Sequence, residues 1–305
     1  MNAPRARLAA ALLTTCVAAA LTVAVPAAPT AAGTAARTPA PDAPHRGTVT
    51  LARDPGRSPA PGRERAVRAF AEGRRARAGA AADLTHNWWG VFPQPGTHDG
   101  IMATHSVDPA YRVTDSENFT YAPTTKAQKS CMEVVTAYWD TGTELWAWDW
   151  CSSPGGPAKV LPVDAEFLST YTTDATGRPA YSVQMVQDDA SANRWSAYLF
   201  NHRTAGWDLL FRQSGKDLSE LEHGWDMFEI YASVNPSTGV GYYCTEARST
   251  VFDSGAVQLR SKGTWKPARP ADSPWTEDRP DGRDFLCPPL RFVQAGANDH
   301  WTVRQ

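Results

Sequence analysis

The sequence predicts an all-β fold: an antiparallel, jelly-roll-like β-sandwich that follows an N-terminal stretch that is either disordered or a pro-segment. Aromatic and polar residues alternate over much of residues 84–305, and Gly, Pro, Asp and Asn divide this region into short runs. Closely spaced short strands are typical of sandwiches and barrels, and beyond one basic segment no stretch repeats with a helical period. We therefore expect one large β domain of about 220 residues.

Residues 1–27 have the features of a secretory signal peptide. Arg5 and Arg7 supply a positive start, residues 8–25 are apolar, and small residues precede a cut near Ala27. The apolar stretch falls short of the roughly 20 residues that span a membrane. We therefore expect a secreted, extracellular protein with no membrane contact after cleavage.

Residues 28–83 are predicted to be a linker or a pro-segment. Residues 28–62 are mostly Ala, Pro, Thr and Arg, and carry too few large apolar side chains to offset the entropy lost on ordering. Residues 63–80 place Arg and Glu around Val67 and Phe70, which is typical of a short basic helix. The arginines offer processing sites, which a pro-segment would use and a solvated linker would not.

Four cysteines remain once the signal is removed, and they are Cys131, Cys151, Cys244 and Cys287. In an exported protein an even number of cysteines indicates a disulfide framework, here two bridges with three possible connectivities. Since no Cys-x-x-Cys pair occurs, we expect no zinc or other metal site.

The composition excludes several classes of function. The formal net charge is −2, and the absence of basic patches beyond residue 80 argues against a nucleic-acid partner. The chain has no Gly-rich phosphate loop and no Gly-x-Ser-x-Gly elbow, so we expect neither a cofactor nor a lipase-type serine hydrolase. We expect a monomer. The excess of Arg over Lys and the Ala- and Pro-rich leader favour a bacterial, high-GC origin.

The strands are predicted from short apolar or aromatic runs bounded by turn residues. In chain order they are 131–139, 144–151, 180–187, 194–201, 206–213, 225–234, 240–247, 255–261 and 300–304. Residues 265–289 are rich in Pro and Asp, and are expected to form a long loop held by Cys287.

The first two predicted strands form a hairpin whose register can be inferred. Residues 140–143 are turn-forming. If Tyr138 lies opposite Glu144, then Cys131 lies opposite Cys151, within the reach of a disulfide. A slip of one residue would exchange the two faces of the hairpin.

The same register places Glu133 opposite Asp149, and the tryptophans at 146, 148 and 150 on the other, core-facing side. Two opposed carboxylates repel, so the pKa of one should rise, which makes a usable acid. The alternative is an exposed acidic pair without a task.

A second candidate, Glu229, lies in the run 225–231. Phe228 and Ile230 form an apolar face suited to the core, and Glu229 lies on the opposite face beside Tyr231. Apolar neighbours reduce the hydration of a carboxylate, which raises its pKa. The alternative is an ordinary glutamate on a strand surface.

Tryptophan is frequent, with 12 in the chain. Most should fill the core, but exposed rings in a sandwich can stack on sugars or other flat groups. Trp88, Trp89 and Trp207 are the expected stacking residues. They support the alternative of a non-catalytic module that binds carbohydrate or cell wall.

Several segments, taken in order, resemble a known family. A strand with Glu133 comes first, a Tyr-x-Val-Gln strand second, an aromatic hairpin with a Gly-Trp turn third, and a strand with Glu229 last; these are residues 132–135, 181–184, 195–207 and 228–231. This order resembles that of the neprosin domain, a β-sandwich of secreted glutamic endopeptidases.

The resemblance implies that Glu133 and Glu229 are the catalytic pair of a glutamic-type endopeptidase, or its remnant in an inactive relative. One carboxylate would take a proton from a water lying between them, and the other would donate a proton to the leaving amine. Gln184, Asp149 and Tyr231 would support the pair, Gln184 by stabilising the oxyanion. The resemblance also implies a polypeptide substrate, activity at acidic pH, and a pro-peptide before residue 84 that shields the cleft.

Overall fold

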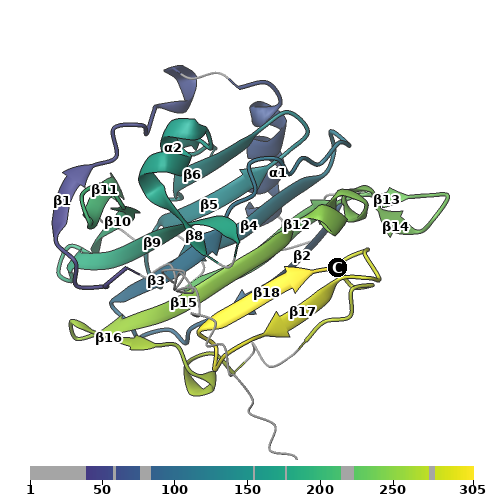
Figure 1. The fold of residues 1–305 in the computed structure, drawn as a ribbon. Helices are drawn as coiled ribbons and strands as arrows, with labels where there is room; N and C mark the ends of the chain where they lie inside the picture. Colours follow the sequence, from purple (N-terminus) through teal and green to yellow (C-terminus); the bar gives the residue numbers. More distant parts are fainter. Residues whose placement is uncertain are drawn as a thin grey trace, which may run out of the picture. The chain divides into compact units, whose positions relative to one another are not determined.

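The computed structural model describes residues 39–57, 60–75, 84–153, 155–175, 177–213, 223–274 and 279–305. Two β-sheets make up most of it (Figure 1), and every strand pair in them is antiparallel except β1 with β11. The predicted all-β, antiparallel sandwich is confirmed. The predicted signal peptide lies outside the described residues, and no helix within them is long and apolar enough to cross a membrane.

The ten-stranded sheet contains, in spatial order, β1 (His45–Thr48), β11 (Gly206–Arg212), β10 (Arg194–Asn201), β9 (Arg178–Asp189), β3 (Gly100–Ser106), β15 (Val251–Ser261), β18 (His300–Arg304) and β17 (Arg291–Gln294), with β8 (Thr172–Ala175) beside β9 and β16 (Thr264–Pro267) beside β15. The six-stranded sheet has the order β2 (Thr85–Val91), β12 (Trp225–Ala232), β4 (Phe119–Lys126), β5 (Met132–Tyr138), β6 (Thr143–Asp149) and β7 (Lys159–Pro162). The remaining elements are β13 (Val234–Asn235), β14 (Val240–Gly241), α1 (Arg63–Arg75), α2 (Ala165–Tyr171), η1 (Pro55–Arg57), η2 (Tyr242–Cys244), η3 (Glu246–Ser249) and η4 (Pro270–Asp272).

The predicted strands are confirmed except over 240–247, where β14 ends at Gly241 and the chain continues as η2 and η3. The predicted basic helix is confirmed as α1. Helix α2 was not expected, because seven residues are too few to show a period. It begins at Asp164, whose side chain accepts hydrogen bonds from the backbone N–H groups of Glu166 and Phe167, an N-cap that stabilises a short helix.

Part of the segment 28–62 is ordered, contrary to expectation. Strand β1 lies beside β11 (Figure 1) and pairs with it in parallel, from His45 opposite Trp207. Backbone hydrogen bonds hold this segment, together with the buried side chain of Val49. The prediction was wrong here because it counted apolar side chains and ignored backbone pairing with an existing sheet.

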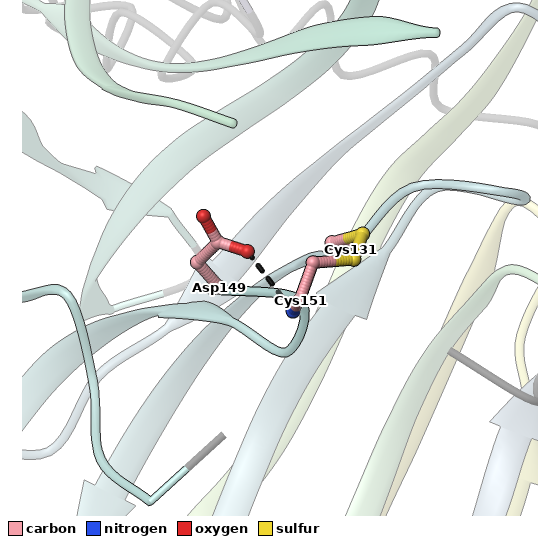
Figure 2. A group of neighbouring side chains, drawn as sticks. All are labelled: Cys131, Asp149 and Cys151. Atoms are coloured by element: carbon pink, nitrogen blue, oxygen red, sulfur yellow. Dashed lines mark hydrogen bonds between the residues drawn. A yellow bond between two sulfur atoms is a disulfide. The ribbon is translucent and has the colours of Figure 1, made fainter. Parts of the chain in front are cut away.

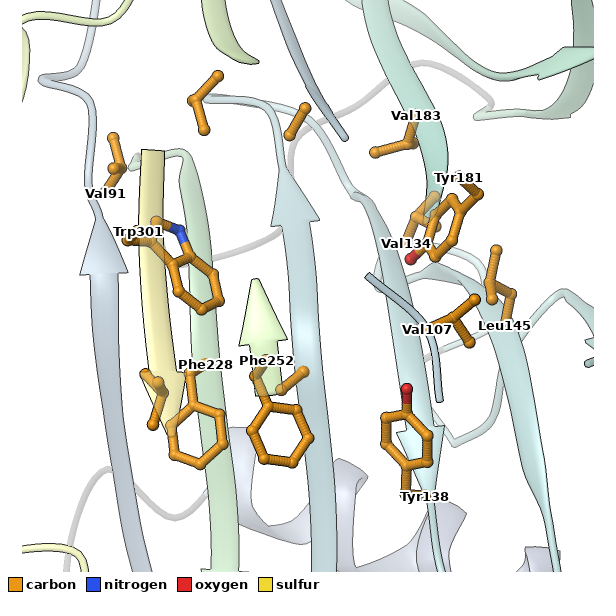
Figure 3. Close-up of a cluster of buried hydrophobic side chains, with 14 of the residues drawn as sticks. Val91, Val107, Val134, Tyr138, Leu145, Tyr181, Val183, Phe228, Phe252 and Trp301 are labelled. Carbon is orange, nitrogen blue, oxygen red and sulfur yellow. The ribbon is translucent and has the colours of Figure 1, made fainter. Parts of the chain in front are cut away.

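The main core lies between the two sheets (Figure 3). Alternate residues of each strand point into it, such as Val134 from the six-stranded sheet and Val183 from the ten-stranded sheet. A polar contact also joins the sheets: Asp226 of β12 accepts hydrogen bonds from Thr125 Oγ1 (2.6 Å) and Trp301 Nε1 (2.8 Å), and lies 2.7 Å from His105 Nε2. These bonds fix which residues of β12 face inward.

The predicted register of the β5–β6 hairpin is wrong by one residue. Glu133 lies opposite Trp148, not opposite Asp149. The turn is closed by a hydrogen bond from Trp139 N to Gly142 O, a position that turn composition alone does not reveal. The faces are therefore exchanged, and the β6 tryptophans lie on the same side as Glu133.

Asp149 consequently lies away from Glu133 and shapes the turn after β6. Its carboxylate accepts a hydrogen bond from Cys151 N at 3.0 Å (Figure 2). The disulfide Cys131–Cys151 is present, as the hairpin predicted, with 5.5 Å between its Cα atoms. Among the described residues Cys131, Asp149 and Cys151 are a group with metal-ligand spacing, but both sulfurs belong to the disulfide and are poor ligands.

The second pair of cysteines also forms a bridge, Cys244–Cys287, which joins η2 to the loop before β17. This loop is the Pro- and Asp-rich region expected to be held by Cys287. Of the three connectivities left open by the sequence, the structure has the one that links neighbours along the chain.

Candidate functional site

Glu133 and Glu229 lie on the same face of the six-stranded sheet, the face turned away from the ten-stranded sheet, which we call the outer face. On β12 Phe228 and Ile230 belong to the core between the sheets, and Glu229 lies between them in sequence. On β5 Val134 faces the core and Glu133 faces outward. Both glutamates are fully buried. Because alternate residues of a strand face the same side of the sheet, the two glutamates predicted to be catalytic lie on one face.

The two glutamates are nevertheless far apart on that face. Glu229 lies opposite Tyr121 of β4, which lies opposite Ala137 of β5, so Glu229 is level with Ala137. Glu133 precedes Ala137 by four residues on the same strand. At about 3.3 Å per residue and 4.8 Å per strand, the two Cα atoms are roughly 16 Å apart. The side chains in this arrangement do not share one water molecule.

Three donors that do not titrate contact the carboxylate of Glu133 among the described residues. Thr124 Oγ1 donates to Oε1 (2.6 Å), Trp225 Nε1 donates to Oε1 (2.8 Å) and Trp150 Nε1 donates to Oε2 (3.0 Å). An indole N–H only donates, so both carboxylate oxygens act as acceptors. Lys126, also buried, lies opposite Glu133 on β4, with its Nζ 5.1 Å from the centroid of the Trp225 ring.

A buried histidine lies next to this network. Gln128 N donates a hydrogen bond of 3.3 Å to His98 Nε2. Burial and the nearby charge of Lys126 lower the pKa of His98 to about 3. The imidazole of His98 is therefore neutral over the physiological range.

Glu229 has a different set of neighbours. Its Oε1 lies 2.5 Å from His86 Nε2 and accepts a hydrogen bond from the hydroxyl of Tyr231 at 3.0 Å. The imidazole of His86 is stacked on Tyr231, with centroids 4.2 Å apart and an angle of 10°, and lies 4.8 Å from the ring of Trp88. These side chains come from two adjacent strands, β2 and β12.

Exposure rises step by step along this group. Glu229 is fully buried, the His86 side chain is 22% exposed and Trp88 is 51% exposed. The imidazole therefore links a buried carboxylate to solvent, beside an exposed indole. Of the predicted residues the structure brings together Glu229, Tyr231 and Trp88. It adds His86, which the sequence analysis did not identify. His86 comes two residues before Trp88, so the two side chains share one face of the strand, and this spacing could have identified it.

Two other predicted residues lie on a different surface. Gln184 and Trp207 belong to the ten-stranded sheet, under the segment that precedes β1. Gln184 Nε2 donates to Pro41 O (2.8 Å) and Trp207 Nε1 donates to Ala40 O (3.3 Å), and both side chains are buried. Gln184 is therefore not beside either glutamate, and Trp207 is not an exposed stacking platform.

Trp89 is also buried, because it points from β2 into the core between the sheets. Its ring makes edge contacts with Phe292 (5.4 Å) and Trp301 (6.2 Å). The expectation of adjacent stacking tryptophans overlooked the alternation of a strand, which sends Trp88 outward and Trp89 inward.

Helix α1 packs on the outer face. The buried ring of Phe70 lies 4.6 Å from Tyr121, 5.1 Å from Trp148 and 5.5 Å from Trp150, measured between centroids. At Gly73 a Cβ atom would lie 1.9 Å from the Tyr231 ring. Only a residue without a side chain allows the helix so close to the partner of Glu229.

An ion pair fixes the start of this helix. Arg63 donates through Nε to Glu144 Oε2 at 2.7 Å and through its terminal nitrogen to Oε1, and both side chains are buried. Trp146 Nε1 also donates to Glu144, at 2.9 Å. The outer face therefore carries three glutamates, and a basic residue of α1 pairs with one of them.

No protein-family model matches the chain, and no curated protein matches it. Solved structures that resemble it include SCP-B, a member of the eqolisin family of peptidases, in a complex with the tripeptide Ala-Ile-His (13% identity, TM-score 0.40). Another is scytalido-glutamic peptidase with a peptide-based transition-state analogue (14% identity, TM-score 0.40). In both, the alignment covers 72% of this chain and 98% of the other. Both of these solved structures are peptidases.

Proposed function

We propose that this protein is a secreted peptide hydrolase whose site lies on the outer face around Glu229. One observation supports this most: a buried carboxylate contacts a partly exposed imidazole beside an exposed indole, in Glu229, His86 and Trp88. A carboxylate and an imidazole in contact are suited to proton transfer. The indole offers a flat apolar surface on which a segment of polypeptide can rest.

We assign different roles to the two glutamates. Glu229 belongs to the reacting group. Glu133 is a positioning residue, since its carboxylate already accepts three hydrogen bonds. These bonds tie β5 to β4 through Thr124, to β12 through Trp225, and to the end of β6 through Trp150. This replaces the expectation of two carboxylates around one water, for which the register leaves too large a gap.

We also propose that α1 belongs to a pro-segment. A solvated linker would not bury Phe70 against the aromatic residues of a sheet, or Arg63 against a glutamate. Residues 76–83 lie between α1 and β2, outside the described residues, and include Arg77. Cleavage there would separate α1 from the part of the chain that forms the outer face.

The proposal is tested by cleavage of an unfolded, proline-rich polypeptide from about pH 3 to pH 7, followed by mass spectrometry. The full chain is compared before and after limited nicking by an arginine-specific protease. We expect cleavage after nicking and dilution, which lets the N-terminal fragment dissociate, and a loss of about 100-fold or more in Glu229→Gln. Glu166→Gln, the same charge change at an exposed position of α2, should match the wild type.

Full activity of Glu229→Gln, or no cleavage by any form of the wild type, would overturn the proposal. In the second case retention on a polysaccharide column that is lost in Trp88→Ala would favour the alternative, a carbohydrate-binding module. That alternative has one observation behind it, the exposure of Trp88, since Trp89 and Trp207 are buried.

A further inference from the structure

We infer that His86 is the catalytic residue that exchanges protons with the substrate, and that Glu229 orients it. This rests on the proposed hydrolytic function. The first reason is accessibility: the carboxylate of Glu229 is fully buried, and its neighbour Tyr231 is nearly so. The imidazole is the titratable group of the three that reaches the surface.

The second reason is the direction of the hydrogen bonds. Oε1 of Glu229 accepts the Tyr231 hydroxyl proton, and a carboxylate at 2.5 Å from Nε2 accepts a proton from it too. The imidazole then carries its hydrogen on Nε2, and Nδ1 becomes the nitrogen with a free electron pair. A carboxylate that fixes the tautomer of a histidine in this way also stabilises the imidazolium once it forms.

The third reason is that the ring is held in place. Tyr231 is stacked on one side at 4.2 Å, and Trp88 lies within 4.8 Å. Among the described residues the titratable groups in contact with the imidazole are Glu229 and Tyr231, both from β12. Helix α1, which touches Tyr231 at Gly73, carries Glu72 at an exposed position.

The step balances as an ordinary hydrolysis. Nδ1 of His86 takes a proton from water, and the oxygen of that water forms a bond to the scissile carbonyl carbon as the C=O π electrons move to oxygen. When the carbonyl re-forms, the C–N bond breaks and Nδ1–H gives its proton to the leaving amine. The products are a carboxylic acid and an amine, and His86 returns to its neutral form.

The pH profile separates this mechanism from one based on two carboxyl groups. An imidazole acts as a base only in its neutral form, so this mechanism predicts activity that falls in acid. A pair of carboxyl groups sharing a proton would instead give an acidic optimum that is lost towards neutral pH.

The test compares kcat and KM of the nicked full chain for wild type, His86→Gln and His300→Gln. His300 is a matched control, because it is another partly exposed histidine, 2.7 Å from Asp253, on the ten-stranded sheet. We expect His86→Gln to lower kcat by about 100-fold or more with little change in KM. His300→Gln should keep the wild-type values. Free imidazole should restore part of the activity of His86→Ala.

The inference fails if the wild type cleaves and His86→Gln keeps its rate and pH profile; the hydrolytic proposal would survive that result. A second measurement needs no activity: nitrogen NMR of the full chain, with signals assigned by comparison with His86→Gln. We expect hydrogen on Nε2 and none on Nδ1. Hydrogen on Nδ1 of the neutral ring would overturn the inference.

Discussion

The two ends of the outer face place a buried glutamate in opposite settings. At one end Glu133 accepts bonds from a hydroxyl and two indoles, none of which changes charge near neutral pH. At the other end Glu229 contacts an imidazole that reaches solvent. The two glutamates are equally buried, so the different roles that we propose for them rest on the chemistry of their nearest hydrogen-bond partners.

The largest effect on stability is expected from replacing Glu133. Glu133→Ala removes the acceptor of the indole N–H groups of Trp225, which is buried, and of Trp150, which is partly buried, beside the buried Lys126. We expect a loss of about 3–5 kcal/mol in the free energy of unfolding, measured in urea. Glu229→Ala should cost less, because water can reach its partner His86. Equal losses at the two positions would remove the distinction between them.

Acid should destabilise the protein first through His98, which lies next to the hydrogen bonds of Glu133. Its pKa is lowered to about 3 in the folded protein, whereas in the unfolded chain it lies near 6.5. Below that value the unfolded state binds the additional proton, so stability is complete above about pH 6.5 and falls by at most about 1.4 kcal/mol per pH unit towards pH 3. His98→Gln should flatten this limb in thermal melts.

His300, whose pKa is shifted in the opposite direction from that of His98, serves as the control for that experiment. The hydrogen bond that the imidazole of His300 donates to Asp253 raises the pKa of His300, so its contribution to stability is present below about pH 6.5 and is lost as the pH rises through the raised pKa. His300→Gln should therefore lower stability by a constant amount below about pH 6.5 and leave the slope of the acid limb unchanged. If His300→Gln flattens the acid limb as well, the assignment to His98 is wrong.

A smaller effect on stability is expected where α1 contacts Tyr231, next to Glu229. In Gly73→Ala the new methyl group would overlap the Tyr231 ring, and we expect a loss of about 1–3 kcal/mol. Gly56→Ala is the control, since nothing lies within 4 Å of a Cβ atom there. Unfolding in urea gives the difference. A stability equal to that of the control would mean that the helix does not press on the partner of Glu229.

The smallest change in stability is expected at the surface. Trp88→Ala should alter the free energy of unfolding by less than about 0.5 kcal/mol, because the indole is half exposed. KM for the polypeptide should rise in the same variant. A large loss of stability with an unchanged KM would make Trp88 part of the fold instead of a contact for substrate.

The sequence predicts the fold class, the helix α1, eight of the 18 strands among the described residues and the Cys131–Cys151 bridge, because each depends on local patterns. It does not reveal β4, whose residues are all buried and so show no alternation, although Thr124 and Lys126 are polar. The hairpin register fails for a similar reason, since one backbone bond in the turn decides it.

The candidate site is only half accessible to prediction. Glu229 and Tyr231 are two residues apart on one strand, so their proximity follows from the strand period. The contact of Glu229 with His86 spans 143 positions in the chain and depends on which strand pairs with β12. Composition and periodicity contain no information on that choice.

The pairing of β1 with β11 bears on the proposed release of the N-terminal segment. A cut between α1 and β2 breaks one peptide bond, yet the released piece would still hold one sheet by a ladder of main-chain bonds and the other by the Arg63 ion pair. Nicked protein would therefore persist as a two-chain complex. Cutting the chain and gaining activity would therefore be two separate steps. The second would require the fragment to dissociate, and so would depend on dilution.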